Sequence, residues 1–448
     1  MPVRAVPTAS PLEIHAPSIS LPLMFVVTGL LALFTGVVWL VAQPNVLSTY
    51  HYNQNTIALT HLCVLGWLCS IVMGAMYQLV PVALETKLYS ERLARGQFFF
   101  HVIGFAGMVW MFRVWNMKQV GNFGALLTAG VILFIYNIVR TLLRVPKWNV
   151  VATAVAAALV WLSLTVTAGL LIATAKYTST INLVSRFNPF SAMHAHAHLG
   201  VVGFFLMLIV GVSYKLIPMF TLSELQNRRR AVGSVILLNL GLAGSVAAVL
   251  LSSRWKPVFA LVIIVALALY GRELIAILRA RKRRALDWGV KYFLTAIALL
   301  VPTTGLALVL SWPGLPLNTF TGQLENAYGF LGLIGVVSFA IIGMLYKIIP
   351  FLVWFGAYSQ HIGHARVPAL AEMYSTRLQA AGFWTYLSGL SATVAATLYS
   401  NATAVRWGCA SLALSLALLA INVGNILSHA VRPRLTSLAK PSTNRITR

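Results

Sequence analysis

Long apolar segments, separated by short polar connections, run along almost the whole chain. Twelve of them reach about 20 residues, the length that a helix needs to cross a bilayer. They lie near 21–43, 57–84, 97–115, 122–143, 149–173, 192–221, 231–252, 257–279, 289–311, 325–355, 379–400 and 405–428. The pattern predicts an all-α membrane protein with about twelve transmembrane helices. The first segment is too long and too apolar for a cleaved signal peptide, so it is predicted to be the first of these helices.

The second, sixth and tenth segments share one pattern of residues. The second contains His61, Gly66, Gly74, Tyr77 and Pro81. The sixth contains, at the same spacing, His198, Gly203, Gly211, Tyr214 and Pro218. The tenth contains Phe330, Gly335, Gly343, Tyr346 and Pro350, with phenylalanine in place of histidine. The pattern predicts three pseudo-symmetric four-helix units, approximately 21–145, 149–280 and 289–428, within a single membrane domain over 21–430.

The basic residues indicate how this domain lies in the membrane. Only 9% of the residues are charged, against about 25% in soluble proteins, yet the net charge is +25. Lysine and arginine are concentrated after every second apolar segment, as in Arg228–Arg230 and 279–284. This positive-inside pattern predicts a multi-pass protein of the bacterial inner membrane, with a cytoplasmic N-terminal tail (1–20) and a basic cytoplasmic C-terminal tail (431–448). The expected partner of the basic charge is therefore the lipid bilayer and not nucleic acid.

Ten histidines are present, and the predicted topology divides them. The cytoplasmic ends and loops are predicted to hold His101, His361, His364 and His429. The outer side is predicted to hold His51, His61, His194, His196 and His198. An imidazole inside a membrane is costly unless it is hydrogen-bonded or ligates a metal. His61 and His198 each precede their proline by 20 residues, so they are expected at similar depth and facing a common centre.

The histidines of the sixth segment are the strongest candidates for a metal site. His194 and His198 are four residues apart on one helix face, which suits two ligands of one centre. His196 projects about 200° away and is predicted to contact another helix or the surface, although it stays in the candidate metal set. Imidazole without thiolate favours copper, or iron held in haem, and haem is the preferred cofactor. The cysteines Cys63, Cys69 and Cys409 show no spacing typical of a disulfide framework or a thiolate site.

Twelve helices in three sets, with histidines on the second helix of successive sets, resemble subunit I of the haem–copper oxidases. The resemblance implies that His61 is a haem ligand and that His198 or His194 is a second haem ligand or a copper ligand. It implies respiratory electron transfer or nitric oxide and oxygen chemistry, with other respiratory-chain subunits or a cytochrome as partners. The enzyme class that it implies is a cytochrome c oxidase-like oxidoreductase. The chain is also similar in class to the haem- and copper-containing membrane proteins of the nitric-oxide response (NnrS).

The chain departs from the oxidase pattern in two places. The tenth segment begins with residues 325–330, Glu-Asn-Ala-Tyr-Gly-Phe, where the family has a His-x-His pair, and segment 231–252 has no histidine. An incomplete haem–copper centre is therefore expected. Tyr328 is a candidate hydrogen-bond partner for the histidines, although an interfacial tyrosine is the favoured interpretation. The alternatives for function are a cofactor-free transporter, for which inverted repeats and midplane charges would be typical, and an oxidase-assembly or scaffold protein.

Overall fold

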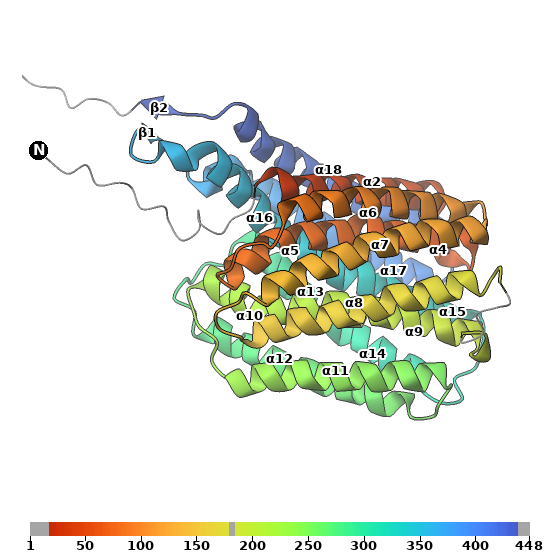
Figure 1. Cartoon of the computed structure of the whole chain (residues 1–448). Helices are drawn as coiled ribbons and strands as arrows, with labels where there is room; N and C mark the ends of the chain where they lie inside the picture. The colour runs from red at the N-terminus through yellow and green to blue at the C-terminus, as the bar shows by residue number, and fades with distance from the viewer. Residues whose placement is uncertain (1–17, 179–183, 438–448) are drawn as a thin grey trace, which may run out of the picture.

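The computed structural model describes residues 18–178 and 184–437, so parts of both predicted tails lie outside the described residues. The fold is all-α apart from one pair of two-residue strands, β1 (Ala365–Arg366) and β2 (Thr436–Ser437). Within the described part of the chain, ten helices are long and apolar enough to cross a membrane. They run roughly parallel and antiparallel to one another in a single bundle (Figure 1). A multi-pass helical membrane protein is the class that this fold defines.

The first third of the chain contains four long helical stretches. They are α2 (Ser20–Ala42), the continuous helix α4 (Gln54–His61), η1 (Leu62–Cys69) and α5 (Ser70–Ala83), then α6 (Glu91–Arg113) and α7 (Met117–Leu142). A short helix, α3 (Asn45–Ser48), lies between the first two. Asn53, Ser90 and Asn116 cap α4, α6 and α7 by accepting hydrogen bonds from backbone N–H groups of the first turn. Such caps satisfy donors that a helix cannot pair internally.

The second third has the same order of elements. It consists of α8 (Val150–Thr174), the continuous helix α9 (Pro189–His198), η3 (Leu199–Leu206) and α10 (Met207–Thr221), then α11 (Arg228–Leu250) and α12 (Lys256–Arg279), with a short 3₁₀ turn, η2 (Val184–Arg186), before α9.

In the last third, α13 (Trp288–Ala298) and α14 (Leu300–Leu310) replace a single straight helix. The break at Leu299 is explained by Pro302, which has no N–H to donate to the carbonyl four residues earlier. The continuous helix α15 (Thr319–Phe330), η4 (Leu331–Ser338) and α16 (Phe339–Tyr358) follows, then η5 (Ser359–His361), η6 (Leu370–Met373), α17 (Thr376–Leu398) and α18 (Ala402–Val431).

The helices α6 and α17 are as long as α2, with 23 residues each, but they are more polar and fall outside the ten candidate spans. The helix predicted from the apolar stretch at 97–115 therefore begins too late. α6 begins at Glu91, directly after the capping residue Ser90. His101 is consequently at mid-helix and buried, where its Nε2 lies 3.0 Å from the Ser70 hydroxyl. Its predicted position at a helix end is wrong for this reason.

Equivalent helices pack in equivalent ways in the three thirds of the chain. The first long helix packs on the second in each third, as α2 on α5, α8 on α10 and α13 on α16. The last two helices form a hairpin in each third, as α6 with α7, α11 with α12 and α17 with α18. α7 contacts α8, α12 contacts α14, and α18 contacts α2. The bundle is therefore a closed ring, and inside it η4 contacts both η1 and η3.

Three π-helical segments occur at matching places in the three continuous helices. They begin directly after His61, His198 and Phe330, and each is eight residues long. π-helical turns inside α-helices are uncommon and are often found at functional sites. A wheel drawn at 3.6 residues per turn does not carry across such a segment, so residues before and after it cannot be assigned to one face from spacing alone.

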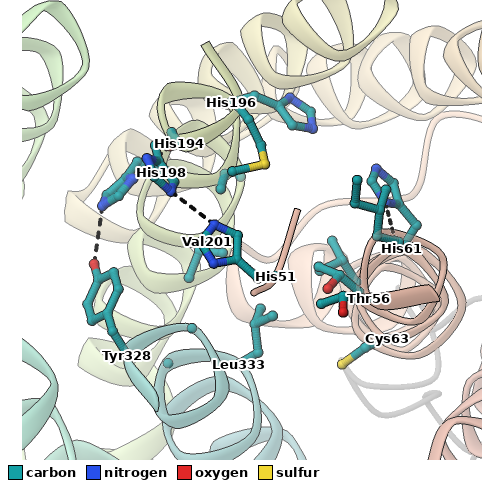
Figure 2. A pocket seen from close by; sticks show the side chains of 18 of the residues that line it. His51, Thr56, His61, Cys63, His194, His196, His198, Val201, Tyr328 and Leu333 are labelled. Atoms are coloured by element: carbon teal, nitrogen blue, oxygen red, sulfur yellow. Dashed lines mark hydrogen bonds between the residues drawn. The ribbon is translucent and has the colours of Figure 1, made fainter. Parts of the chain in front are cut away.

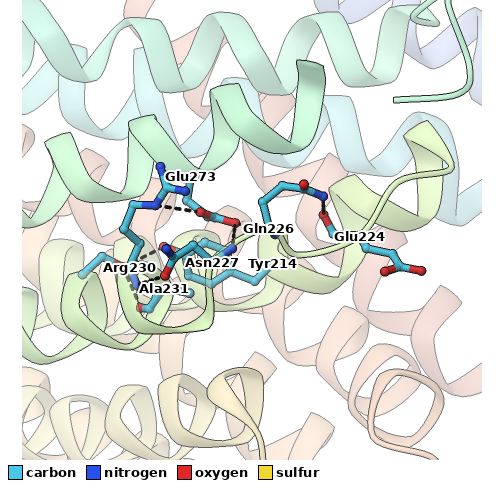
Figure 3. A network of polar contacts seen from close by, with 8 residues as sticks. Tyr214, Glu224, Gln226, Asn227, Arg230, Ala231 and Glu273 are labelled. Carbon is cyan, nitrogen blue, oxygen red and sulfur yellow. Dashed lines mark hydrogen bonds and ion pairs between the residues drawn. The ribbon is translucent and has the colours of Figure 1, made fainter. Parts of the chain in front are cut away.

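One buried polar residue near the end of the fourth helix binds the start of the third helix in each third. The Asn137 side chain accepts from the N–H of Ser90 and donates to its carbonyl, and Asn422 does the same to Ser375. Glu273 takes this role in the second third by accepting from the N–H groups of Gln226 and Asn227 (Figure 3). The separation is 47 residues for Ser90–Asn137, Gln226–Glu273 and Ser375–Asn422.

Candidate functional site

A large cavity of about 650 Å³ lies between the helices toward one end of the bundle. Its walls are mostly apolar, and α4, α9 and α15, which border it, lie together at that end (Figure 1). Five histidines line it: His51, His61, His194, His196 and His198. These are the five residues that the sequence predicts on one side of the membrane. The volume falls in the range of about 300–1,000 Å³ that is usual for cofactor and ligand pockets.

His61 of α4 and His196 of α9 face each other across part of this cavity (Figure 2). Their ring centroids are 6.5 Å apart and their planes differ by 17°. Two imidazoles that ligate one ion from opposite sides have ring centres about 6 Å apart, given metal–nitrogen bonds of roughly 2 Å. The observed pair therefore has a ring separation and near-parallel planes that would suit two ligands of one metal ion.

The backbone holds both rings in the tautomer that a metal ligand needs. The Nδ1 of His61 donates to the carbonyl of Ile57 at 2.8 Å, and the Nδ1 of His196 donates to the carbonyl of Thr165 at 3.0 Å. Among the residues that the structure describes, Nε2 of neither ring has a hydrogen-bond partner. A histidine ligand commonly donates its other ring N–H to a carbonyl in this way, which fixes the ring and makes the free nitrogen more basic.

His198 lies on the other face of α9 and is paired differently. Its Nδ1 donates to the carbonyl of His194 at 2.7 Å, so its Nε2 accepts from the Tyr328 hydroxyl, which is 3.2 Å away. Tyr328 is therefore a hydrogen-bond partner of a histidine, the interpretation that the sequence ranked below an interfacial tyrosine. The tyrosine occupies the nitrogen that would otherwise ligate a metal, so His198 needs a movement of Tyr328 before it can bind one.

His61 and His198 both line this cavity, but the histidine ring that faces His61 is that of His196. His196 does contact another helix, as predicted, through Thr165 of α8. The opposite faces assigned to His194 and His196 agree with the structure. It was not predicted that His194 and His196 line the same cavity. The helix α9 forms part of the cavity wall, and residues from both faces of this helix line the cavity. Spacing along one helix could not predict this arrangement.

Two residues of the cavity were not assigned a role from the sequence. His51 lies in the connection between α3 and α4, with its Nε2 3.4 Å from the Nε2 of His194. Glu325 lies in α15, with a carboxylate oxygen 3.7 Å from the Nδ1 of His51. One ligand atom of each of these three residues lies within 4.8 Å of the other two. The available signal was that an acidic residue and the histidines were expected on the same side of the membrane.

Hydrogen bonds from α15 hold the segment that precedes His51. The side-chain amide of Asn326 donates to the carbonyls of Leu47 and Thr49 at 3.2 and 2.7 Å. Gln323 donates to the carbonyl of Ser48 at 2.9 Å. These bonds fix the connection against the helix that carries Glu325. Burial lowers the pKa of the His51 imidazole.

Replacing Asn326 by alanine is expected to free the segment 47–53. The variant loses two hydrogen bonds from a buried side chain, at a cost of about 1–3 kcal/mol in local stability. Hydrogen–deuterium exchange of peptides covering 44–56 should be faster than in the parent protein. Asn122→Ala, which removes an exposed amide on α7, is the matched control. Unchanged exchange in Asn326→Ala would show that other contacts hold the segment.

The cysteines behave as the sequence predicts: Cys63, Cys69 and Cys409 are all free. Cys63 lines the cavity, but it is not part of the one group of potential metal ligands found among the described residues.

Comparison with protein-family models finds no match, and comparison with curated proteins finds none either. The class is therefore defined by the fold: an integral, multi-pass helical membrane protein with a histidine-lined cavity between its helices.

Proposed function

We propose that this chain is a haem-binding membrane protein of the haem–copper oxidase subunit I type, acting in respiratory electron transfer or in nitric oxide or oxygen chemistry. The observation that carries the proposal is the pair of parallel rings of His61 and His196, each with Nδ1 bonded to a carbonyl. Haem bound there would supply iron for one-electron transfer or for gas binding. His196 replaces His198 and His194 as the preferred partner of His61.

The lining of the rest of the cavity also suits a haem. Its lining is apolar over most of its area, which suits a flat macrocycle. Two lysines, Lys176 and Lys256, also line it and suit the negatively charged edge of a haem. The chain's residues would orient the cofactor through the carbonyls of Ile57 and Thr165 and exclude water through the apolar walls.

The proposed architecture is three pseudo-symmetric four-helix units, twelve membrane helices in all. It is supported by the matching π-helical segments and by the three buried side chains that bind a helix start 47 residues earlier. The positive-inside pattern supports the bacterial inner membrane with both termini in the cytoplasm. Other respiratory-chain subunits or a cytochrome would be its partners. The missing histidines in 325–330 and in α11 support an incomplete centre.

The test is the absorption spectrum of the full-length protein, purified from cells supplied with haem, in the oxidised and dithionite-reduced states. We expect a Soret band that falls by roughly tenfold or more in His61→Ala and in His196→Ala. His364→Ala, an exposed histidine in the η5–η6 loop, is the control and should leave the band unchanged.

Loss of the band in His198→Ala but not in His196→Ala would instead assign the second axial position to His198. Protein without a Soret band and without copper by elemental analysis would overturn the proposal and leave a cofactor-free transporter or an assembly scaffold.

A further inference from the structure

The cluster formed by His51, His194 and Glu325 is chemically distinct from the pair of rings at His61. It combines two imidazoles and one carboxylate from three separate parts of the chain, namely the α3–α4 connection, α9 and α15. His194 lies on the opposite face of α9 from His196, so the two groups of histidines point to different parts of the cavity (Figure 2). One small ion could therefore occupy the cluster while a larger group occupies the other part.

The polar atoms of this cluster have few or poor hydrogen-bond partners in the protein. The Nε2 atoms of His51 and His194 are 3.4 Å apart, a distance at which one neutral ring can at best donate weakly to the other. The Nδ1 of His51 is buried and has no hydrogen-bond partner among the described residues. The nearest carboxylate oxygen of Glu325, at 3.7 Å, is too far for a hydrogen bond. A buried polar atom left without a partner destabilises the protein, and an ion bound at the cluster would satisfy it.

We propose that His51, His194 and Glu325 bind a divalent transition-metal ion of the zinc or copper class, separate from haem. Two imidazole nitrogens and a carboxylate oxygen form a ligand set used by such ions, with a fourth position left for water or another ligand. The side chains of His51 and Glu325 are only 17% and 25% exposed, so the ion would be held inside the protein. Calcium and magnesium, which prefer several oxygen ligands, do not match two imidazoles.

The surroundings are built to hold two of the ligands in position. Asn326 follows Glu325 in α15 and binds the carbonyls of Leu47 and Thr49, just before His51. The spacing between the carboxylate and this imidazole is thus set by hydrogen bonds from the Asn326 side chain to main-chain carbonyls. Support of this kind around the ligands is typical of metal sites. Ligand atoms around one ion lie roughly 3–4 Å apart, so the present spread of up to 4.8 Å requires only a small rotation of side chains.

This proposal rests on the proposed function and deepens it, because it assigns ligands to a metal ion separate from the haem. The probe is cobalt(II), added to full-length, tag-free protein that has been treated with a chelator. Four-coordinate cobalt produces intense visible absorption bands, whereas cobalt in water does not. We expect these bands to saturate at one cobalt per chain, and Glu325→Gln, His51→Ala and His194→Ala each to weaken binding by roughly 10- to 100-fold.

Glu372→Gln and His364→Ala remove the same chemical groups from exposed positions and should leave cobalt binding unchanged. Glu325→Gln keeps the size of the side chain, so a folded variant is expected, and its melting temperature checks this. The absence of cobalt bands in the parent protein, or bands that persist unchanged in Glu325→Gln and His51→Ala, would overturn the inference. A Soret band without cobalt binding rejects this site alone, and cobalt binding without a Soret band rejects the haem alone.

Discussion

Replacing Gly343 by valine is expected to separate α13 from α16 and to destabilise the protein more than any other single change considered. A Cβ at this position would lie 2.6 Å from the carbonyl oxygen of Gly289 and 2.8 Å from the Cβ of Tyr292. Both neighbours belong to α13, and backbone atoms cannot move aside as the end of a flexible side chain can. Overpacking costs about 1–3 kcal/mol and occasionally more, and contact with backbone atoms places this variant at the upper end. Small residues are what allow membrane helices to approach so closely.

The measurement is the thermal unfolding of the purified protein in detergent, followed by size-exclusion chromatography of heated samples. Gly271→Val is the matched control, because a Cβ on Gly271 of α12 meets no described atom within 4 Å. That variant should be at least as stable as the parent protein, since glycine is a poor helix former. Equal losses in the two variants would show that the contact between Gly343 and α13 does not limit stability.

Replacing Arg230 by methionine is expected to cause the second large loss of stability. Glu273 is fully buried, and one of its carboxylate oxygens lies 3.1 Å from the Arg230 Nε (Figure 3). Removing one partner of a buried ion pair leaves the other charge without compensation, at about 3–5 kcal/mol. Arg230 is itself 29% exposed, and two backbone N–H groups still bind Glu273. The lower end of that range, about 3 kcal/mol, is therefore expected.

The melting temperature again measures the effect, with Arg229→Met as the control. Arg229 precedes Arg230 and is exposed, so both variants remove one positive charge from the first turn of α11. Adding Glu273→Gln to Arg230→Met should recover part of the loss, because the amide carries no charge but can still accept from the two N–H groups. A double variant as unstable as the two single losses combined would contradict a direct pairing of the charges.

The sequence predicts the helices well because membrane helices are defined by length and hydrophobicity, which are local properties. Its errors lie at the ends, where polar first turns such as the one from Glu91 belong to the helix but not to the apolar stretch. The π-helical segments could not be predicted, since their residues are ordinary apolar ones and the wide turn arises from packing between helices.

The site was predicted in composition but not in pairing. The five histidines that were predicted on one side of the membrane do line one cavity, and Tyr328 does bond to His198. His61 and His196 face each other because of how α4 and α9 are oriented across the cavity. The spacing of residues within one helix does not predict this orientation. The same holds for His51 and Glu325, which are 274 residues apart in the chain and meet where Asn326 and Gln323 bind α15 to the segment before His51.

The hydrogen bonds that span 47 residues also set the order in which the chain can mature in the membrane. The N–H and the carbonyl of Ser90 bond to Asn137, a residue that is synthesised only after nearly all of α7. Until then the N–H and the carbonyl of Ser90 lack the side chain that binds them in the folded protein. A chain that ends before Asn137 would therefore contain α6 without the hydrogen bonds that fix its start.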